Sequence, residues 1–150
     1  DAYFATYPKL AEYLKNTKEE VRKIGYVETL FGRRRSLPEI HAANAIVRAQ
    51  AERMAINAPA QGTEADITKL AMIEIQKWLE KEYGNTSTRP YLLLQIHDSF
   101  LLESPKSETK KVADHVKKIM VSTAKLAVPL TVDVSIGPNW GELEKVKNHE

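Results

Sequence analysis

Asp98 is the residue of this sequence whose type and position most clearly indicate chemistry. It lies in Tyr91–Glu103, a run that otherwise consists mainly of apolar, strand-forming residues. A dry, unpaired carboxylate costs on the order of several kcal/mol, so Asp98 must reach water or meet a cation. Hard divalent cations take oxygen ligands, so a metal site is one interpretation. The other is a turn, in which His97-Asp98 joins two short strands and Asp98 bonds its own backbone; the two are compatible.

Arg53, Asn57 and Gln61 are spaced by four residues, and on one continuous helix they would form a single polar stripe. Arginine only donates hydrogen bonds, whereas the two amides can donate and accept. The minor-groove edges of paired bases present acceptors in nearly the same place for every pair, so such a stripe could inspect pairing without reading sequence. An ordinary solvent-exposed face explains the spacing equally, and Pro59 is expected to bend the helix within the stripe.

Other polar residues leave several interpretations open. The arginine run 33–35 could bind phosphates, form a solvated hairpin tip, or pair with Glu28 and Glu39. Arg48 would lie on a different side of its helix from the stripe and could address a DNA backbone separately. His97 could be a ligand, a substrate contact or simply a turn residue.

Composition limits the possible classes of protein. The chain has 150 residues and is 43% hydrophobic, enough for one domain with a real core. The segment from Arg22 to Arg53 holds seven basic residues against three acidic ones, a local net charge of +4, so the rest of the chain carries −2 of the total of +2. Such a segment favours a polyanion as partner, although a solvated face also explains it.

Several features exclude or favour particular locations. The absence of cysteine excludes disulfides and thiolate metal sites, and it fits a reducing cytosol. No apolar stretch approaches the roughly 18 residues of a membrane span, so no membrane partner is expected. The chain begins with Asp-Ala-Tyr-Phe rather than methionine, which suggests a fragment of something larger.

Hydrophobic periodicity and helix-breaking residues predict four helices, at 8–24, 41–57, 63–83 and 107–127. Pro59 separates the second from the third, and Thr63 is expected to cap the third. A basic hairpin is predicted over 26–37, a second pair of strands over 91–103, a further strand over 130–136, and a polar tail over 141–150. This order predicts an α+β fold, with a small antiparallel sheet that has helices packed on one face, preceded by a helical segment.

Seven segments occur in order along nearly the whole chain: Tyr3–Pro8, Gly25–Arg35, Ala51–Pro59, Gln61–Asp66, Leu94–Asp98, Val128-Pro129 and Gly137–Trp140. Each alone is a weak signal, but the set is specific. Together they closely resemble the C-terminal part of family A DNA polymerases of the bacterial polymerase I type. The resemblance implies that residues 1–42 form the rear of the fingers subdomain and residues 43–150 the C-terminal part of the palm, with its palm-type sheet.

The resemblance also assigns roles to single residues. Asp98 matches one of the family's two metal-binding aspartates. Arg53, Asn57 and Gln61 match its minor-groove contacts, which favours DNA contact over a plain solvent face. His97 matches a residue near the primer end, and Arg48 a position near the DNA backbone.

The implied reaction is attack of a primer 3′-hydroxyl on a deoxynucleoside triphosphate, with two Mg²⁺ ions as cofactors in the complete enzyme. The expected partners are primer-template DNA, deoxynucleoside triphosphates and the missing upstream part of the polymerase. The resemblance implies a location in the cytoplasm, at the bacterial nucleoid, or in an organelle or a phage-infected cell. The chain departs from the family pattern in three places. Ser99 stands where the family usually has glutamate, and neither the second aspartate segment nor the nucleotide-gripping fingers helix occurs in the sequence.

We therefore expect a C-terminal fragment of a template-directed DNA polymerase that is inactive by itself, because one carboxylate cannot assemble two ions about 4 Å apart. A non-catalytic duplex-DNA-binding module derived from such a polymerase is the alternative. An α+β domain with no nucleic-acid role is a third possibility, and salt-dependent duplex binding would argue against it.

Overall fold

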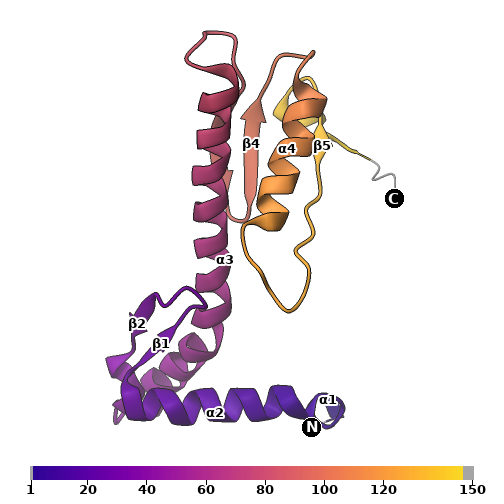
Figure 1. The fold of residues 1–150 in the computed structure, drawn as a ribbon. Helices are drawn as coiled ribbons and strands as arrows, with labels where there is room; N and C mark the ends of the chain where they lie inside the picture. Colours follow the sequence, from indigo (N-terminus) through magenta and orange to yellow (C-terminus); the bar gives the residue numbers. More distant parts are fainter. Residues whose placement is uncertain (1, 147–150) are drawn as a thin grey trace. The chain divides into compact units, whose positions relative to one another are not determined.

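The computed structural model describes residues 2–146, which fall into two compact units divided between Asp66 and Ile67 (Figure 1). The first unit contains helices α1 (Ala2–Thr6) and α2 (Pro8–Ile24), strands β1 (Tyr26–Glu28) and β2 (Arg34–Ser36), and the 3-10 helix η1 (Pro38–His41). Helix α3 (Ala45–Tyr83) begins in this unit and ends in the second.

Helix α2 has the boundaries that its local sequence predicts. Pro8 stands in its first turn, where the fixed φ of proline suits a helix and the missing N–H is not needed. Gly25 ends the helix with a left-handed φ of 78°, and its N–H donates to the carbonyl of Val21. The predicted basic hairpin is also confirmed, with shorter strands, as β1 and β2 pair antiparallel with Val27 opposite Arg35.

The core of the first unit lies between α2, the hairpin, η1 and the early part of α3. Its buried members are aliphatic: Val21, Val27, Leu37, Ile40, Ala51 and Ala55. Gly62 lets the hairpin approach the helix closely, since a Cβ at this position would lie 2.6 Å from the Cγ2 methyl of Thr29. The hairpin is therefore held directly against α3.

The prediction of two helices separated at Pro59 is wrong, because α3 runs continuously from Ala45 to Tyr83 with Pro59 inside it. Local propensity is outweighed here by packing on both sides of the proline. Ala55 is fully buried, and Thr63 is only 7% exposed. Rather than capping a helix, the Thr63 hydroxyl donates to the Pro59 carbonyl (2.6 Å) and accepts from the Leu30 N–H (3.0 Å), which ties α3 to the hairpin loop.

The second unit contains the later part of α3 and, among the described residues, six further elements in chain order. These are β3 (Tyr91–Ile96), β4 (Ser99–Glu103), α4 (Thr109–Ser122), β5 (Ser135–Ile136), the 3-10 helix η2 (Trp140–Glu142) and β6 (Glu144–Lys145). The β3–β4 hairpin is antiparallel, with an irregularity between Leu92 and Leu94. Its side chains pack on the helices: Leu92, Phe100 and Leu102 lie against a core of Ile75, Leu79, Val112 and Val116 from α3 and α4.

The predicted α+β class and the small antiparallel sheets are confirmed, and helices cover one face of the β3–β4 hairpin. Two extents are wrong. The helix predicted over 107–127 is the shorter α4, and the strand predicted over 130–136 is reduced to Ser135–Ile136, which pair with a short partner strand. That partner, Glu144–Lys145, lies in the predicted polar tail, whose last residues, 147–150, fall outside the described part. The fingers–palm boundary at 42/43 stays a prediction.

Candidate nucleic-acid interface

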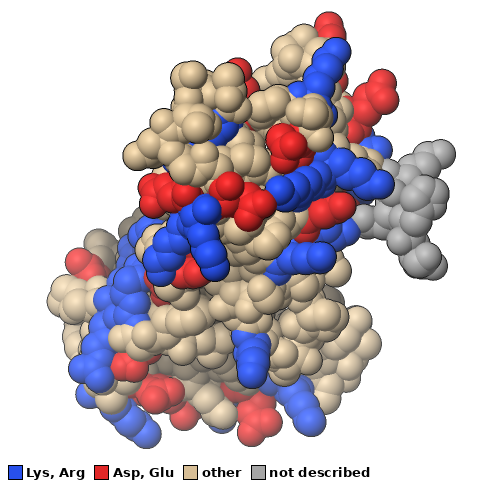
Figure 2. Space-filling view, turned by 45° about the horizontal axis from the view of Figure 1, so that its top comes forward, with Lys and Arg blue, Asp and Glu red and all other residues tan. Residues whose placement is uncertain are grey.

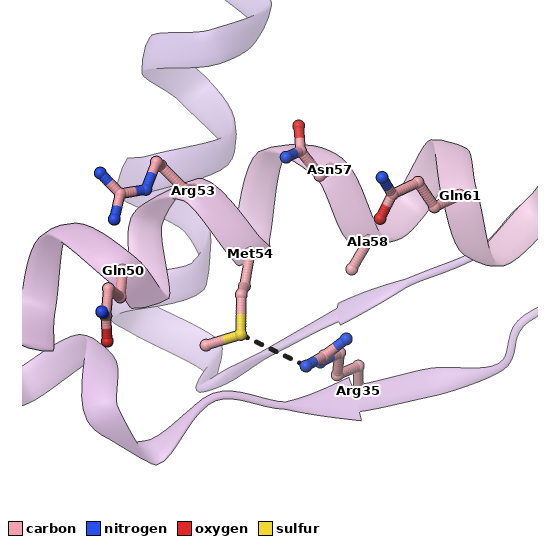
Figure 3. A pocket seen from close by; sticks show the side chains of 7 residues that line it. All are labelled: Arg35, Gln50, Arg53, Met54, Asn57, Ala58 and Gln61. Atoms are coloured by element: carbon pink, nitrogen blue, oxygen red, sulfur yellow. Dashed lines mark hydrogen bonds between the residues drawn. The ribbon is translucent and has the colours of Figure 1, made fainter.

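Arg53, Asn57 and Gln61 lie on one unbroken helix, and all three side chains are exposed. The continuity of α3 through Pro59 removes the break that the sequence predicts inside this stripe. The three side chains line an open hollow of about 350 Å³ in the first unit (Figure 3). We call it the α3 groove; its lining is completed by Arg35, Gln50, Met54 and Ala58. A single face of the helix thus presents a row of hydrogen-bond donors to solvent.

The three hairpin arginines differ in their partners. The Arg33 Nε donates to Asp66 (2.7 Å) and its Nη2 to the Gly62 carbonyl (2.9 Å). The Arg34 Nε donates to Glu28 (2.7 Å), and this hydrogen bond and charge raise the pKa of the Arg34 guanidinium. Of the interpretations left open by sequence, ion pairing therefore holds for these two, with Asp66 rather than Glu39 as the partner of Arg33.

Arg35 is different, because no carboxylate among residues 2–146 pairs with it. Its Nη2 donates instead to the Met54 sulfur at 3.2 Å, which is a weak acceptor. Figure 3 shows Arg35 reaching from β2 toward Met54, beneath the helix that carries the stripe. On the face drawn in Figure 2, basic and acidic side chains are mostly interspersed.

Arg48 is half-buried, and its Nη1 donates to the Ala42 carbonyl (2.8 Å), just before α3 begins. This hydrogen bond holds the segment that precedes α3 against the first turn of the helix. Its predicted place near a DNA backbone stays a prediction.

Asp98 lies at the tip of the β3–β4 hairpin in the second unit, in a two-residue connection with His97. The turn that the sequence allows is therefore present. His97 has a left-handed φ of 54°, and the Ser99 hydroxyl donates back to the Ile96 carbonyl across the turn (2.8 Å). The Asp98 side chain is exposed and makes no hydrogen bond or ion pair with any other described residue. It faces solvent, free to accept a cation.

The donors around Asp98 allow a test of whether a metal ion fits. An exposed carboxylate is a suitable ligand for a hard cation. Within the described range, however, no group of three or more histidine, aspartate or glutamate side chains is positioned to hold a metal ion. The described residues therefore offer one exposed carboxylate at this turn but no complete set of metal ligands around it.

Sequence reasoning missed three groove residues on the helix. Gln50, Met54 and Ala58 follow the same spacing of four as the stripe, one helical row away, so the helix pattern could have found them. Arg35 belongs to the arginine run that the sequence names as possible phosphate ligands, but only the packing of the hairpin on α3 brings it to the groove.

Comparison with known proteins decides the family. The model of the family described as DNA polymerase family A matches residues 1–142. The chain belongs to DNA polymerase family A. It is 43% identical over 142 residues to DNA polymerase I of Pseudomonas aeruginosa and 47% identical over 140 residues to the thermostable DNA polymerase I of Thermus aquaticus. These matches cover 95% and 93% of this chain, but only 15% and 16% of the two relatives.

A solved structure supports the same family. The chain is similar to the POL domain of Pol1 from M. smegmatis, solved in complex with DNA primer-template and dNTP, with a TM-score of 0.79 and 39% identity. The match covers 85% of this chain and 22% of that one. The resemblance to family A that the sequence motifs indicate is thereby confirmed. Among the described residues of this family A chain, no helix has both the length and the apolar character needed to cross a membrane.

Proposed function

We propose that this family A chain is the C-terminal portion of a template-directed DNA polymerase and holds the primer-template duplex in the α3 groove. The observation that carries the proposal is the row of exposed donors from Arg53, Asn57 and Gln61 along one continuous helix. Purine N3 and pyrimidine O2 occupy nearly the same minor-groove position in every base pair, so these donors would report correct pairing for any sequence. Residues 1–42 would belong to the fingers and 43–150 to the palm.

Asp98 would serve as one of two aspartates that hold the catalytic Mg²⁺ ions in the complete enzyme. Its support is the exposed, unpaired carboxylate at the tip of a short two-residue turn. When bound, the ions would supply the charge that activates the primer 3′-hydroxyl and steadies the leaving pyrophosphate. His97 would lie near the primer end, and Arg48 near the DNA backbone.

The chain alone would not polymerise. Mg²⁺ demands near-octahedral oxygen coordination, and two ions about 4 Å apart need more carboxylates than Asp98 offers. A second aspartate would have to come from the rest of the polymerase.

The test is a template-directed primer-extension assay with the chain alone and with the chain mixed with an upstream polymerase fragment that carries the second aspartate. We expect no extension by the chain alone, and extension by the mixture. Asp98→Asn should return the mixture to background because it removes a ligand charge. Asp114→Asn, at an exposed acid on α4, is the matched control and should retain activity. Extension by the chain alone would disprove the need for a second aspartate, and an active Asp98→Asn mixture would disprove the metal role.

A non-catalytic duplex-binding module is the second candidate, and Ser99 favours it. A serine replaces the usual glutamate beside Asp98, and its hydroxyl is engaged with the Ile96 carbonyl. A mixture that binds duplex DNA but never extends a primer would identify this module instead.

A further inference from the structure

The hairpin beside the α3 groove carries three consecutive arginines, and their charges are not equally compensated. Arg33 is paired with Asp66 and Arg34 with Glu28, each at 2.7 Å. Among residues 2–146, Arg35 has no acidic partner. The hydrogen bond that its side chain makes within this range goes to the neutral Met54 sulfur, which leaves the positive charge uncompensated. Arg35 is therefore the hairpin arginine that has charge available for a ligand.

Arg35 also lies in the right place for a ligand of the groove. It lines the same hollow as Arg53, Asn57 and Gln61 but comes from β2 rather than from the helix (Figure 3). Gln50, Asn57 and Gln61 are neutral amides, suited to neutral base edges. A guanidinium beside them is suited to an anion, which it can bind through two parallel N–H donors. The bond to a thioether sulfur is weak, so an anionic oxygen would displace it readily.

Building on the proposed function, we propose that Arg35 binds a phosphate of the duplex backbone while the α3 stripe contacts the base edges. Arg35 would position the duplex against the helix without reading sequence, as phosphate contacts do. The sequence leaves phosphate binding open for the whole arginine run 33–35, and the ion pairs of Arg33 and Arg34 now single out Arg35.

The first experiment measures duplex binding by the full chain as a function of salt. Each phosphate neutralised contributes about 0.9 to the slope of log K against log salt concentration. Arg35→Ala should lower the slope by about 0.9 and weaken binding about eightfold at ~0.1 M salt. Arg34→Ala is the matched control on the same strand and should leave the slope unchanged, because Glu28 already compensates Arg34. Arg35→Lys should keep the slope, since it retains the charge.

The second experiment identifies the phosphate. Single methylphosphonate substitutions, which remove one backbone charge, are placed along each strand of the duplex. At one position the substitution should weaken binding by wild type and by Arg34→Ala but have no effect on Arg35→Ala. Sodium pyrophosphate at matched ionic strength should displace duplex equally from wild type and Arg35→Ala.

The outcomes separate this inference from the proposed function. The inference is wrong if Arg35→Ala has the same salt slope and affinity as Arg34→Ala, or if Arg35→Lys loses as much slope as Arg35→Ala. It is also wrong if every methylphosphonate position that weakens binding by wild type weakens binding by Arg35→Ala as well. Stronger competition by pyrophosphate for wild type would assign Arg35 to a free phosphate and would also overturn it. If Arg53→Ala still weakens binding in those cases, the proposed function stands. If the affinity of wild type for duplex DNA does not change with salt concentration, the proposed function itself is wrong.

Discussion

The backbone of His97 constrains the tip of the β3–β4 hairpin independently of any contact its side chain makes. Its φ of 54° lies in the left-handed region, which histidine tolerates better than branched residues do and glycine adopts freely. His97, which would lie near a primer end, is therefore also needed to adopt the left-handed backbone conformation of the turn. If a substitution of His97 lowers activity, the loss of a primer contact and the strain in the turn can be told apart only when stability is measured as well.

We expect His97→Gly to preserve the free energy of unfolding and His97→Val to lower it by about 1–2 kcal/mol, because a left-handed backbone crowds the branched Cβ. Urea denaturation measures both. Leu94→Val, at an exposed position of β3 that pairs with Leu101, is the control and should have little effect, since valine suits a paired strand. Equal stability of the Gly and Val variants would show that the turn relaxes to accommodate either.

At the scale of elements, the α3 groove depends on how closely the β1–β2 hairpin packs on α3. Thr29 lies at the closest approach, opposite Gly62. Its hydroxyl accepts hydrogen bonds from the N–H groups of Phe31 (3.3 Å) and Arg33 (3.2 Å), so its methyl cannot easily rotate away. Because the same hairpin carries Arg35, this packing also sets the width of the groove.

Gly62→Ala should destabilise the chain despite the roughly 1 kcal/mol by which helix propensity favours alanine. The new Cβ would lie 2.6 Å from the Thr29 methyl, and overpacking of this kind costs about 1–3 kcal/mol. Chemical denaturation checks the sign. Adding Thr29→Ser removes the methyl but keeps the hydroxyl, so the double variant should recover the loss. A stabilised single variant would contradict the close packing.

Ion pairs of Glu52 connect α3 to α2. Its carboxylate pairs with Lys18 (3.3 Å) and with Arg22. Burial raises the pKa of Glu52, but the hydrogen bonds from Lys18 and Arg22 outweigh burial and hold that pKa below its ordinary value. A lowered pKa in the folded state means that the pair contributes stability above the unfolded pKa of about 4.3 and loses it as the pH falls through the folded value.

The difference in unfolding free energy between wild type and Glu52→Gln should therefore be constant near neutral pH and shrink below about pH 4. Urea titrations at several pH values measure it. Glu12→Gln, at an exposed acid on α2, is the control and should show no such convergence. A difference that grows on acidification would contradict the sign of the shift.

Considered as a whole, the molecule shows which features local sequence can predict. The limits of α2 follow from Pro8 and Gly25, and the β3–β4 hairpin follows from a polar pair between apolar runs. The stripe follows from spacing alone. These features are encoded within a few residues of where they appear.

The features that local sequence did not predict depend on distant partners. The continuity of α3 past Pro59 rests on contacts such as that between Thr63 and Leu30, which are far apart in sequence. Strand β5 forms by pairing with β6, which follows later in the chain, and Arg35 reaches the groove because the hairpin packs on the helix. Within the described range Asp98 belongs to no group of three or more possible metal ligands, so a local pattern could not reveal the further ligands that the proposed metal site needs.

The unbroken course of α3 from Arg53 to Gln61 has an evolutionary consequence. Each residue of an α-helix advances the side-chain direction by about 100°, so loss or gain of a single codon between these positions would turn Gln61 away from Arg53 by that angle. Natural selection should remove insertions and deletions between Arg53 and Gln61 wherever the three side chains must act together. The connection 84–90 carries no such phase requirement, and related genes should vary in length there instead.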